Sequence, residues 1–453
     1  MLAVALAVAA NAAQAQVGAW RTLTMKTSQS ISGTFHDMGA TRAIDHTDKA
    51  VTYYETMVGG QTQGHFVLNK DGTRYFIVDL PSDIVVSDFE TDAPNEALFF
   101  CGKRMVGDQT NGVYGQVSFR TGVSSADFWC LDVTEVACLD KMVLFKDGLV
   151  HFVFATAEGL SHESRIFFSM SLSLSAGYSI GATHWVMDVR PEEHLYDVAL
   201  TDDYVVFMGH EADHHGLSLR RFLRSNPMNT EKDRVYCFAL PPEDMLSTPV
   251  LADLRTTLAV NGENDLAVAY MTQTNSGVYG SRVRVFDVAT MTNTQTQCYM
   301  MREKMDVREM AYAGSAKKLA LLQDGNPRAG SAAERSVVCL MPYLGVPYNA
   351  DVLTWNGVRF ASVDAIPENA ASTRHVVLGH HDMGHVVWTL KNVGASDVAS
   401  GCHLTDGVAV RIEANLSRVE IADPLQDTPV DDMTFIYQVS KTSDNINHYC
   451  LEQ

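Results

Sequence analysis

Histidines form the densest group of chemically versatile residues in the sequence. Six of the sixteen histidines lie in two short segments, 209–216 and 379–385, and His162 stands beside Glu163 in a third segment of the same kind. The candidate ligand residues are His162, His210, Asp213, His214, His215, His380, His381, Asp382 and His385. Neutral imidazole is the commonest ligand of transition metals, and a nearby carboxylate can orient its second nitrogen. These residues define a candidate ligand face and weak candidates for a divalent metal.

The spacing favours ordinary surface histidines over a metal centre. The segments lack the His-x-x-x-His spacing of one helix face, and the two clusters fall three repeats apart in the sequence. No pair of cysteines and histidines has zinc-finger spacing. We therefore expect polar hairpin tips, assign no metal ligand, and expect no cofactor beyond the divalent metal that the histidine density raises as a hypothesis.

Catalytic residues are not assigned by any motif. The sequence has no Gly-x-Ser-x-Gly turn of the kind that exposes a serine nucleophile. Several carboxylates lie in or beside strand-like runs, namely Asp45, Asp48, Asp88, Asp197, Asp306 and Asp364. A ring of such groups could supply the acid and nucleophile of a glycosidase, or bind a cation. The favoured interpretation is structural: each accepts backbone hydrogen bonds from an adjacent loop.

The elements that must position these residues are short strands. Between residues 195 and 240, four apolar runs are separated by turn residues, and this pattern recurs roughly every fifty residues, the period range of propellers and arrays. The first runs are predicted at Ala43–Asp48, Ile84–Phe89, Met142–Lys146, Tyr196–Thr201, Thr257–Asn261, Val307–Tyr312, Val358–Asp364 and Val408–Glu413. No window has persuasive helical periodicity, so we expect an all-β fold.

Four strands per repeat resemble the blades of a β-propeller, with the first run of each blade nearest the axis. We predict a single propeller over residues 16–453, with eight blades favoured and seven as the alternative. The strand near residues 20–25 is expected to close the ring by joining the last blade. A large β-sandwich or two stacked β domains is the remaining alternative. The resemblance is to the architecture only, because the repeat motifs of known propeller families are missing.

Residues 1–15, MLAVALAVAANAAQA, resemble a secretory signal peptide with a small-residue cleavage site, so we expect a secreted, periplasmic or cell-surface protein. No later apolar stretch is long enough for a membrane helix. The net charge of −20, without a basic run, argues against nucleic acid as a partner. In an oxidising compartment, Cys130 with Cys138, or Cys402 with Cys450, are candidate disulfides, although packing is favoured for Cys130.

Two functional hypotheses follow from the sequence. The first is a non-enzymatic scaffold or adhesion component that presents its loop face to a protein or a glycan, because the scaffold is regular and no constellation converges on chemistry. The alternative is a polysaccharide hydrolase or lyase that uses carboxylates facing the central channel. The two differ in whether carboxyl groups meet around a solvent-filled space, as glycoside chemistry requires.

Overall fold

The protein was analysed as a computed structural model. Residues 50–69, 75–92, 95–119, 125–174, 179–211, 216–227, 264–273 and 279–293 are described, and elsewhere only strands are described. Every named element is a β-strand. No helix among these residues is long and apolar enough to span a membrane. The prediction of an all-β fold is confirmed.

The strands of the first half of the chain form four sheets, and in each sheet consecutive strands pair antiparallel. The first sheet contains β2 (Thr34–Ala43), β3 (Ala50–Val58), β4 (Gln61–Asn69) and β5 (Tyr75–Asp79). The second contains β6 (Ile84–Asp92), β7 (Ala97–Val106), β8 (Gln109–Phe119) and β9 (Ser125–Val133), with β1 (Arg21–Thr24) added at its edge. The third contains β10 (Val136–Asp147), β11 (Val150–Gly159), β12 (Ser164–Ser173) and β13 (Ser179–Asp188). The fourth contains β14 (Glu193–Leu200), β15 (Tyr204–Glu211), β16 (Gly216–Leu223) and β17 (Arg234–Ala239).

The second half of the chain continues the pattern. The fifth sheet contains β18 (Thr257–Val260), β19 (Asp265–Gln273), β20 (Tyr279–Asp287), β21 (Thr292–Asn293) and β22 (Tyr299–Glu303). The sixth contains β23 (Met305–Ala313), β24 (Lys318–Gly325), β25 (Ser336–Pro342) and β26 (Val352–Thr354). The seventh contains β27 (Val358–Ala365), β28 (His375–His381), β29 (Gly384–Leu390), β32 (Ile436–Ser440) and β33 (His448–Cys450), while β30 (Ala409–Ile412) pairs only with β31 (Val419–Ala422).

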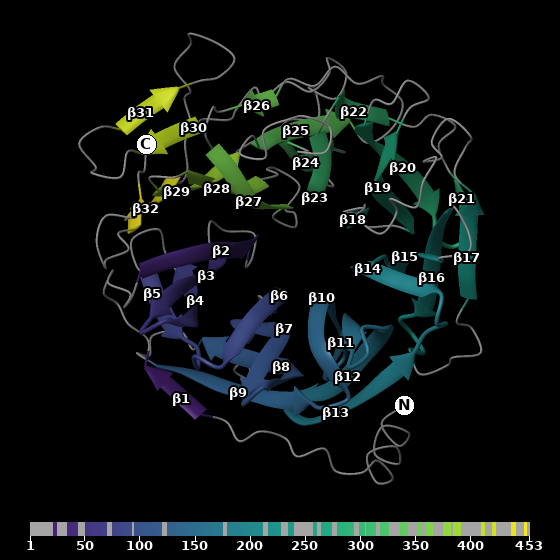
Figure 1. Cartoon of the computed structure of the whole chain (residues 1–453), viewed down its shortest axis with the longest axis horizontal. Helices are drawn as coiled ribbons and strands as arrows, with labels where there is room; N and C mark the ends of the chain where they lie inside the picture. Colours follow the sequence, from purple (N-terminus) through teal and green to yellow (C-terminus); the bar gives the residue numbers. More distant parts are fainter. Residues whose placement is uncertain are drawn as a thin grey trace.

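The sheets are arranged radially, with the first strand of each nearest the centre of the molecule (Figure 1). These first strands contact one another in sequence order from β2 to β27, and β27 in turn contacts β2. This is the arrangement of a β-propeller, so the predicted architecture is confirmed. Six of the predicted first runs, from Ile84–Phe89 to Val358–Asp364, overlap innermost strands.

The favoured count of eight blades is not confirmed. The described strands form seven sheets of four or five strands and one two-stranded pair. The run predicted to begin an eighth blade, Val408–Glu413, overlaps β30. The strand that follows the pair of β30 and β31, β32, pairs with β29 of the seventh sheet. At the first repeat, Ala43 is the end of β2, so the predicted run at Ala43–Asp48 starts where the observed strand finishes.

The N-terminal strand does not join the last sheet as we expected. Instead β1 pairs antiparallel with β9, placing Arg21 opposite Phe128 and Thr24 opposite Ser125. The outer edge of β9 has backbone groups that need a partner, and an added strand satisfies them. The expectation of ring closure by β1 is therefore corrected. The proposed signal segment, residues 1–15, lies outside the described residues.

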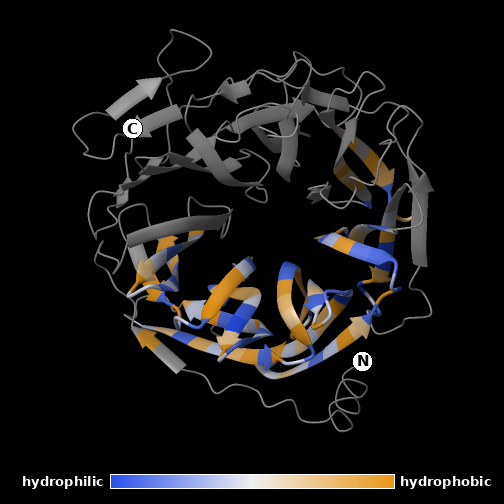
Figure 2. Ribbon diagram, viewed as in Figure 1, coloured by the Kyte–Doolittle hydropathy of each residue, from blue (hydrophilic) through white to orange (hydrophobic). Residues whose placement is uncertain are grey.

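The core consists of apolar seams between neighbouring sheets. Hydrophobic residues recur along the strands of the second and third sheets (Figure 2). Aromatic pairs cross each of the first three seams, among them Phe66 and Phe89, Tyr114 and Phe167, and Phe154 and Phe207, with ring centroids 5.2, 5.5 and 6.1 Å apart. Each sheet alone would leave these rings exposed, so the stability of a sheet depends on its neighbours.

A β-bulge recurs in the innermost strands, opposite a glycine of the second strand. The bulges and their glycines are Val86/Asp88 with Gly102, Leu195/Asp197 with Gly209, and Phe360/Ser362 with Gly379. A Cβ atom on Gly102 would overlap the carbonyl oxygen of Val85, and one on Gly209 would overlap that of His194. Only glycine allows the two backbones to approach so closely at the bulge.

Candidate functional site

The bulge in β6 places the side chain of Asp88 against the neighbouring sheet. Asp88 accepts hydrogen bonds from the backbone N–H of Phe89, at 2.9 Å, and of Met142 on β10, at 3.0 Å. Asp197, at the matching position of β14, accepts a hydrogen bond from the N–H of Val198 at 2.9 Å. Both carboxylates are used to satisfy backbone amides, as the structural interpretation of the inner acids predicted. A carboxylate held in this way is poorly suited to proton transfer.

Of the other four candidate acids, the structure gives strand positions for two. Asp306 lies on β23 and Asp364 on β27, where they pair in register with Asp324 and Val376. Asp45 and Asp48 lie outside the described residues.

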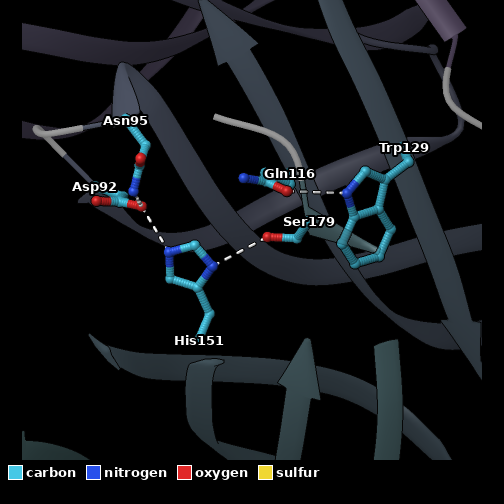
Figure 3. Close-up of polar contacts among 6 residues, drawn as sticks. All are labelled: Asp92, Asn95, Gln116, Trp129, His151 and Ser179. Atoms are coloured by element: carbon cyan, nitrogen blue, oxygen red, sulfur yellow. Dashed lines mark hydrogen bonds and ion pairs between the residues drawn. The ribbon is translucent and has the colours of Figure 1, made fainter. Parts of the chain in front are cut away.

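A chain of buried polar side chains joins the second and third sheets. Asp92 at the end of β6 lies 2.6 Å, Oδ2 to Nε2, from His151 on β11, and Nδ1 of His151 lies 3.0 Å from the hydroxyl of Ser179 on β13. Asn95 donates a hydrogen bond to the same Asp92 oxygen at 2.5 Å. Figure 3 shows the ring of His151 between Asp92 and Ser179, with the nearby hydrogen bond from Trp129 to Gln116. We call Asp92, His151 and Ser179 the seam relay.

The seam relay has the residue types of a serine hydrolase triad but not its setting. Asp92 is 8% exposed, and His151 and Ser179 are each 1% exposed, so substrate has no approach to the hydroxyl. The ring is also reversed: the carboxylate faces Nε2 and the hydroxyl faces Nδ1, opposite to the usual triad. The relay is therefore a structural connection between sheets. No sequence motif marks the relay, because its members come from three strands of two sheets.

The lowered pKa of Asp92 agrees with a structural role for the seam relay. Burial alone would raise the pKa of Asp92, but hydrogen bonds from His151 and Asn95, and the charges of His151 and Lys146, outweigh burial and lower it. The carboxylate is thus the stable form. With Asp92 ionised, Nε2 of His151 donates to it, and Nδ1 of the ring faces the Ser179 hydroxyl.

A second relay lies within the first sheet. Nδ1 of His65 on β4 is 3.0 Å from Oδ1 of Asp79 on β5, and its Nε2 is 2.8 Å from the hydroxyl of Thr56 on β3. His65 and Thr56 are each 1% exposed. The same residue chemistry therefore occurs twice in buried positions, which supports a role in holding strands together.

One inner-strand carboxyl group differs from all of these. Asp140 lies in the irregular part of β10 between Leu139 and Met142, on a strand nearest the centre of the ring. Its side chain is exposed, and no hydrogen bond to its carboxyl group is found among the described residues. Desolvation raises its pKa, Lys141 opposes this, and the charges of Asp88 and Glu158 raise it further. Asp140 is thus an exposed carboxyl group with a raised pKa, and catalytic acids also show raised pKa values.

Of the predicted histidines, His162 is a surface residue at a hairpin tip. Its side chain is 86% exposed, its backbone φ is 66°, and it forms an ion pair with Glu158. The hydrogen bond and charge of Glu158 raise the pKa of His162. This is the polar hairpin tip that the sequence predicted.

His210 is buried, unlike His162. Its ring lies close to those of His194 and Tyr196, at centroid distances of 5.0 and 5.4 Å, and its Nδ1 is 2.5 Å from the Tyr196 hydroxyl. Burial, and then the charge of His194, lower the pKa of His210 to about 4. Next to these rings, the buried side chain of Glu193 accepts hydrogen bonds from Arg220 at 3.2 and 2.5 Å.

Among the remaining predicted ligand residues, strand pairing places two histidines opposite each other. His380 on β28 pairs in register with His385 on β29, and His381 pairs with Gly384. Asp213, His214, His215 and Asp382 lie outside the described residues. Within the described part of the chain, no three or more His, Cys, Asp or Glu residues are grouped to hold a metal ion.

Comparisons with known proteins give the architecture alone. No family model and no curated protein matches the chain. Among solved structures, the β-propeller domain of the trilobed protease from Pyrococcus furiosus aligns with 79% of this chain and 96% of that chain, at 7% identity and a TM-score of 0.46. The acylaminoacyl peptidase of Pyrococcus horikoshii aligns over 84% of this chain, at 8% identity and a TM-score of 0.45, so this chain spans about half, 54%, of its length. Kuenenia stuttgartiensis hydrazine synthase aligns over 79% and 97% of the two chains, at 10% identity and a TM-score of 0.46.

These comparisons correct the first functional hypothesis. The sequence favoured a non-enzymatic scaffold, whereas the similar structures include a protease and a peptidase. We therefore do not retain the scaffold. The sequence also missed Asp140, because it lies in a bulge, outside the regular run predicted to start at Met142.

The candidate disulfide between Cys130 and Cys138 is also corrected, since these two cysteines are not joined by a disulfide bond. Cys402, of the second candidate pair, lies outside the described residues.

Proposed function

We propose that this chain is a polysaccharide hydrolase or lyase in which Asp140, on the strand nearest the ring centre, donates a proton to the leaving group. The observation that supports the proposal is the combination of exposure with a raised pKa at Asp140. The protonated carboxyl group is the form that a general acid needs, and burial together with neighbouring acids is the usual way to obtain it.

Glu158 is the candidate second carboxylate. It lies on β11, paired in register with Cys138 of β10, and its side chain is 48% exposed. Asp88 and Glu158 both raise the pKa of Asp140, and Glu158 also forms an ion pair with His162. A pair of neighbouring carboxyl groups is what the acid and the base or nucleophile of glycoside chemistry require.

The test is a panel of neutral and acidic polysaccharides, with release of reducing ends measured for hydrolysis and formation of unsaturated products for elimination. We expect turnover of at least one polymer, and we expect D140N to lower kcat about 100-fold or more while the protein stays folded. Asp147 is the matched control, because it is an exposed aspartate at the end of the same strand, and D147N should retain full activity. No turnover of any polymer, or equal activity of D140N and wild type, would reject the proposal.

We also propose that the ring is a closed propeller of seven blades. The support is the set of seven sheets of four or five strands and the contact of β27 with β2. The proposal places β32 and β33 in the last blade rather than in an eighth. An experimental structure with eight radial sheets would contradict it.

A further inference from the structure

The bulge of β10 that carries Asp140 is held by side chains from three other strands. In the pairing of β10 with β11, Asp140 and Lys141 together stand opposite one residue, Thr156. Two residues opposite one is the geometry of a β-bulge, which leaves backbone groups without their usual partners in the sheet. Such groups need other partners where water is excluded. Side chains from β6, β7 and β11 supply them.

Two of these side chains accept hydrogen bonds from consecutive amides of β10. The N–H of Lys141 donates to the hydroxyl of Thr156 at 3.0 Å, and the N–H of Met142 donates to Oδ2 of Asp88 at 3.0 Å. Thr156 is 4% exposed and Asp88 is 5% exposed, so water does not compete for them. The other oxygen of Asp88 accepts the N–H of Phe89 at 2.9 Å. The Asp88 carboxylate therefore cannot turn away without leaving a backbone amide unpaired.

The third side chain binds the carbonyl group of Asp140 itself. Sγ of Cys101, a fully buried residue of β7, donates to the carbonyl oxygen of Asp140 at 3.5 Å. Burial, followed by the charge of Asp88, raises the pKa of this thiol, so it keeps the proton that it donates. The backbone at Asp140 is thus held from below, while its side chain is exposed. A fixed backbone beneath an exposed functional group is the arrangement that preorganises a site.

We propose that Thr156 and Asp88 are positioning residues for Asp140, which hold its carboxyl group in the geometry for proton transfer to a leaving group. Both side chains are buried, so they act through the backbone of β10 and do not touch substrate. The catalytic part of this role rests on the proposed function. The holding of the bulge does not, because the hydrogen bonds that carry it exist without substrate.

Asp88 also acts on Asp140 through its charge. Desolvation raises the pKa of Asp140, Lys141 on the same strand opposes this, and the negative charges of Asp88 on β6 and Glu158 on β11 raise it further. Removing the charge of Asp88 should therefore lower the pKa of Asp140 as well as loosen the bulge. Removing the hydroxyl of Thr156 deletes a hydrogen bond without changing any charge. The two residues thus separate position from acidity.

The first experiment measures kcat and KM of the full-length protein on a polymer that the wild type turns over. T156V removes the hydroxyl at nearly constant volume, and we expect kcat to fall about tenfold or more while KM changes less than about twofold. T156S keeps the hydroxyl and should retain most of kcat. T56V is the matched control, since Thr56 is also buried and its hydroxyl lies 2.8 Å from Nε2 of His65 in the first sheet. It should lower thermal stability but not kcat.

Three outcomes of this experiment would overturn the positioning role. They are an unchanged kcat in T156V, a loss in T156S equal to that in T156V, and a loss of the same size in T56V. The last would show that any lost buried hydrogen bond lowers activity through stability alone.

The second experiment needs no substrate. Amide hydrogen exchange at Lys141 should be at least about tenfold faster in T156V than in the wild type, and not in T156S. NMR titration of the Asp140 carboxyl carbon, assigned with D140N, should give a lower midpoint in D88N. D147N, at the exposed end of the same strand, should leave that midpoint unchanged. Unchanged exchange in T156V or an unchanged midpoint in D88N would overturn the inference, and if D88N does not fold, exchange in T156V decides.

The two experiments separate this inference from the proposed function. If the wild type turns over no polymer, the proposed function fails, and exchange at Lys141 with titration of Asp140 still decides whether Thr156 and Asp88 hold the bulge. If the wild type is active but exchange and titration are unchanged in the variants, the positioning role alone fails.

Discussion

Nε2 of His151 lies 2.6 Å from Oδ2 of Asp92, and this contact joins two sheets inside the core. Removing the negative charge of Asp92 should leave the buried ring of His151 without its ionic partner. We expect D92N to lower the free energy of unfolding by about 2–4 kcal/mol, measured by denaturant titration. D108N, at an exposed hairpin tip, should change it by less than about 0.5 kcal/mol. Equal effects of the two substitutions would contradict the seam relay.

The pKa of Asp92 also predicts how stability depends on pH. Its folded pKa is lowered below the ordinary 3.8, so its contribution is present above that value and is lost as pH falls through the folded pKa. The difference in unfolding free energy between wild type and D92N should be complete above about pH 5 and shrink below pH 4. Denaturant titrations of both proteins across this range provide the measurement. A difference that grows on acidification would be inconsistent with a lowered pKa.

The two classes of histidine should titrate apart. His162 has a pKa raised above 6.5 by Glu158, whereas burial and His194 lower that of His210 to about 4. NMR titration of the histidine ring protons, assigned with H162Q and H210Q, should give the first midpoint above 6.5 and the second well below it. A common midpoint would indicate that the ring stack at His210 is open to water.

The bulge glycines should be intolerant of a side chain. We expect G102A or G209A to cost about 3 kcal/mol or more, because the new methyl group overlaps a backbone carbonyl. Gly148 is a useful comparison, since it has a φ of 58° and no atom within 4 Å of its missing Cβ. G148A should therefore cost only about 1–2 kcal/mol of backbone strain. Thermal or chemical unfolding of the three variants would distinguish overlap from strain.

The proposed signal segment predicts a specific N-terminus for the exported protein. If residues 1–15 are a signal peptide, the protein secreted by a host that processes the segment should begin at Gln16. N-terminal sequencing of the secreted protein is the measurement. A retained N-terminus, or a product confined to the cytoplasm, would contradict this expectation.

The strands were predictable because their apolar runs and turn residues are local. The runs at Tyr196–Thr201 and Val307–Tyr312 overlap β14 and β23, and the period between such runs indicated the propeller. The blade count was harder, because β32 pairs with β29 across a long intervening segment. Nothing local in a sequence specifies such a distant partner.

The functional residues were less predictable than the fold. The histidine clusters were conspicuous in composition, yet His162 is a hairpin tip and His210 is buried in a ring stack. Neither the seam relay nor Asp140 is marked by a sequence motif. The seam relay is assembled from separate strands, and the position of Asp140 depends on a bulge. The glycines at 102, 209 and 379 were an available clue, since each stands opposite a bulge.

The hydrogen bond from the amide of Met142 to the carboxylate of Asp88 has a consequence for measuring motion in this protein. Its donor belongs to one sheet and its acceptor to the next, so the amide proton is protected only while the two sheets stay together. Deuterium exchange at Met142 would thus report the separation of whole blades, whereas exchange at amides bonded within a sheet reports the fraying of strands.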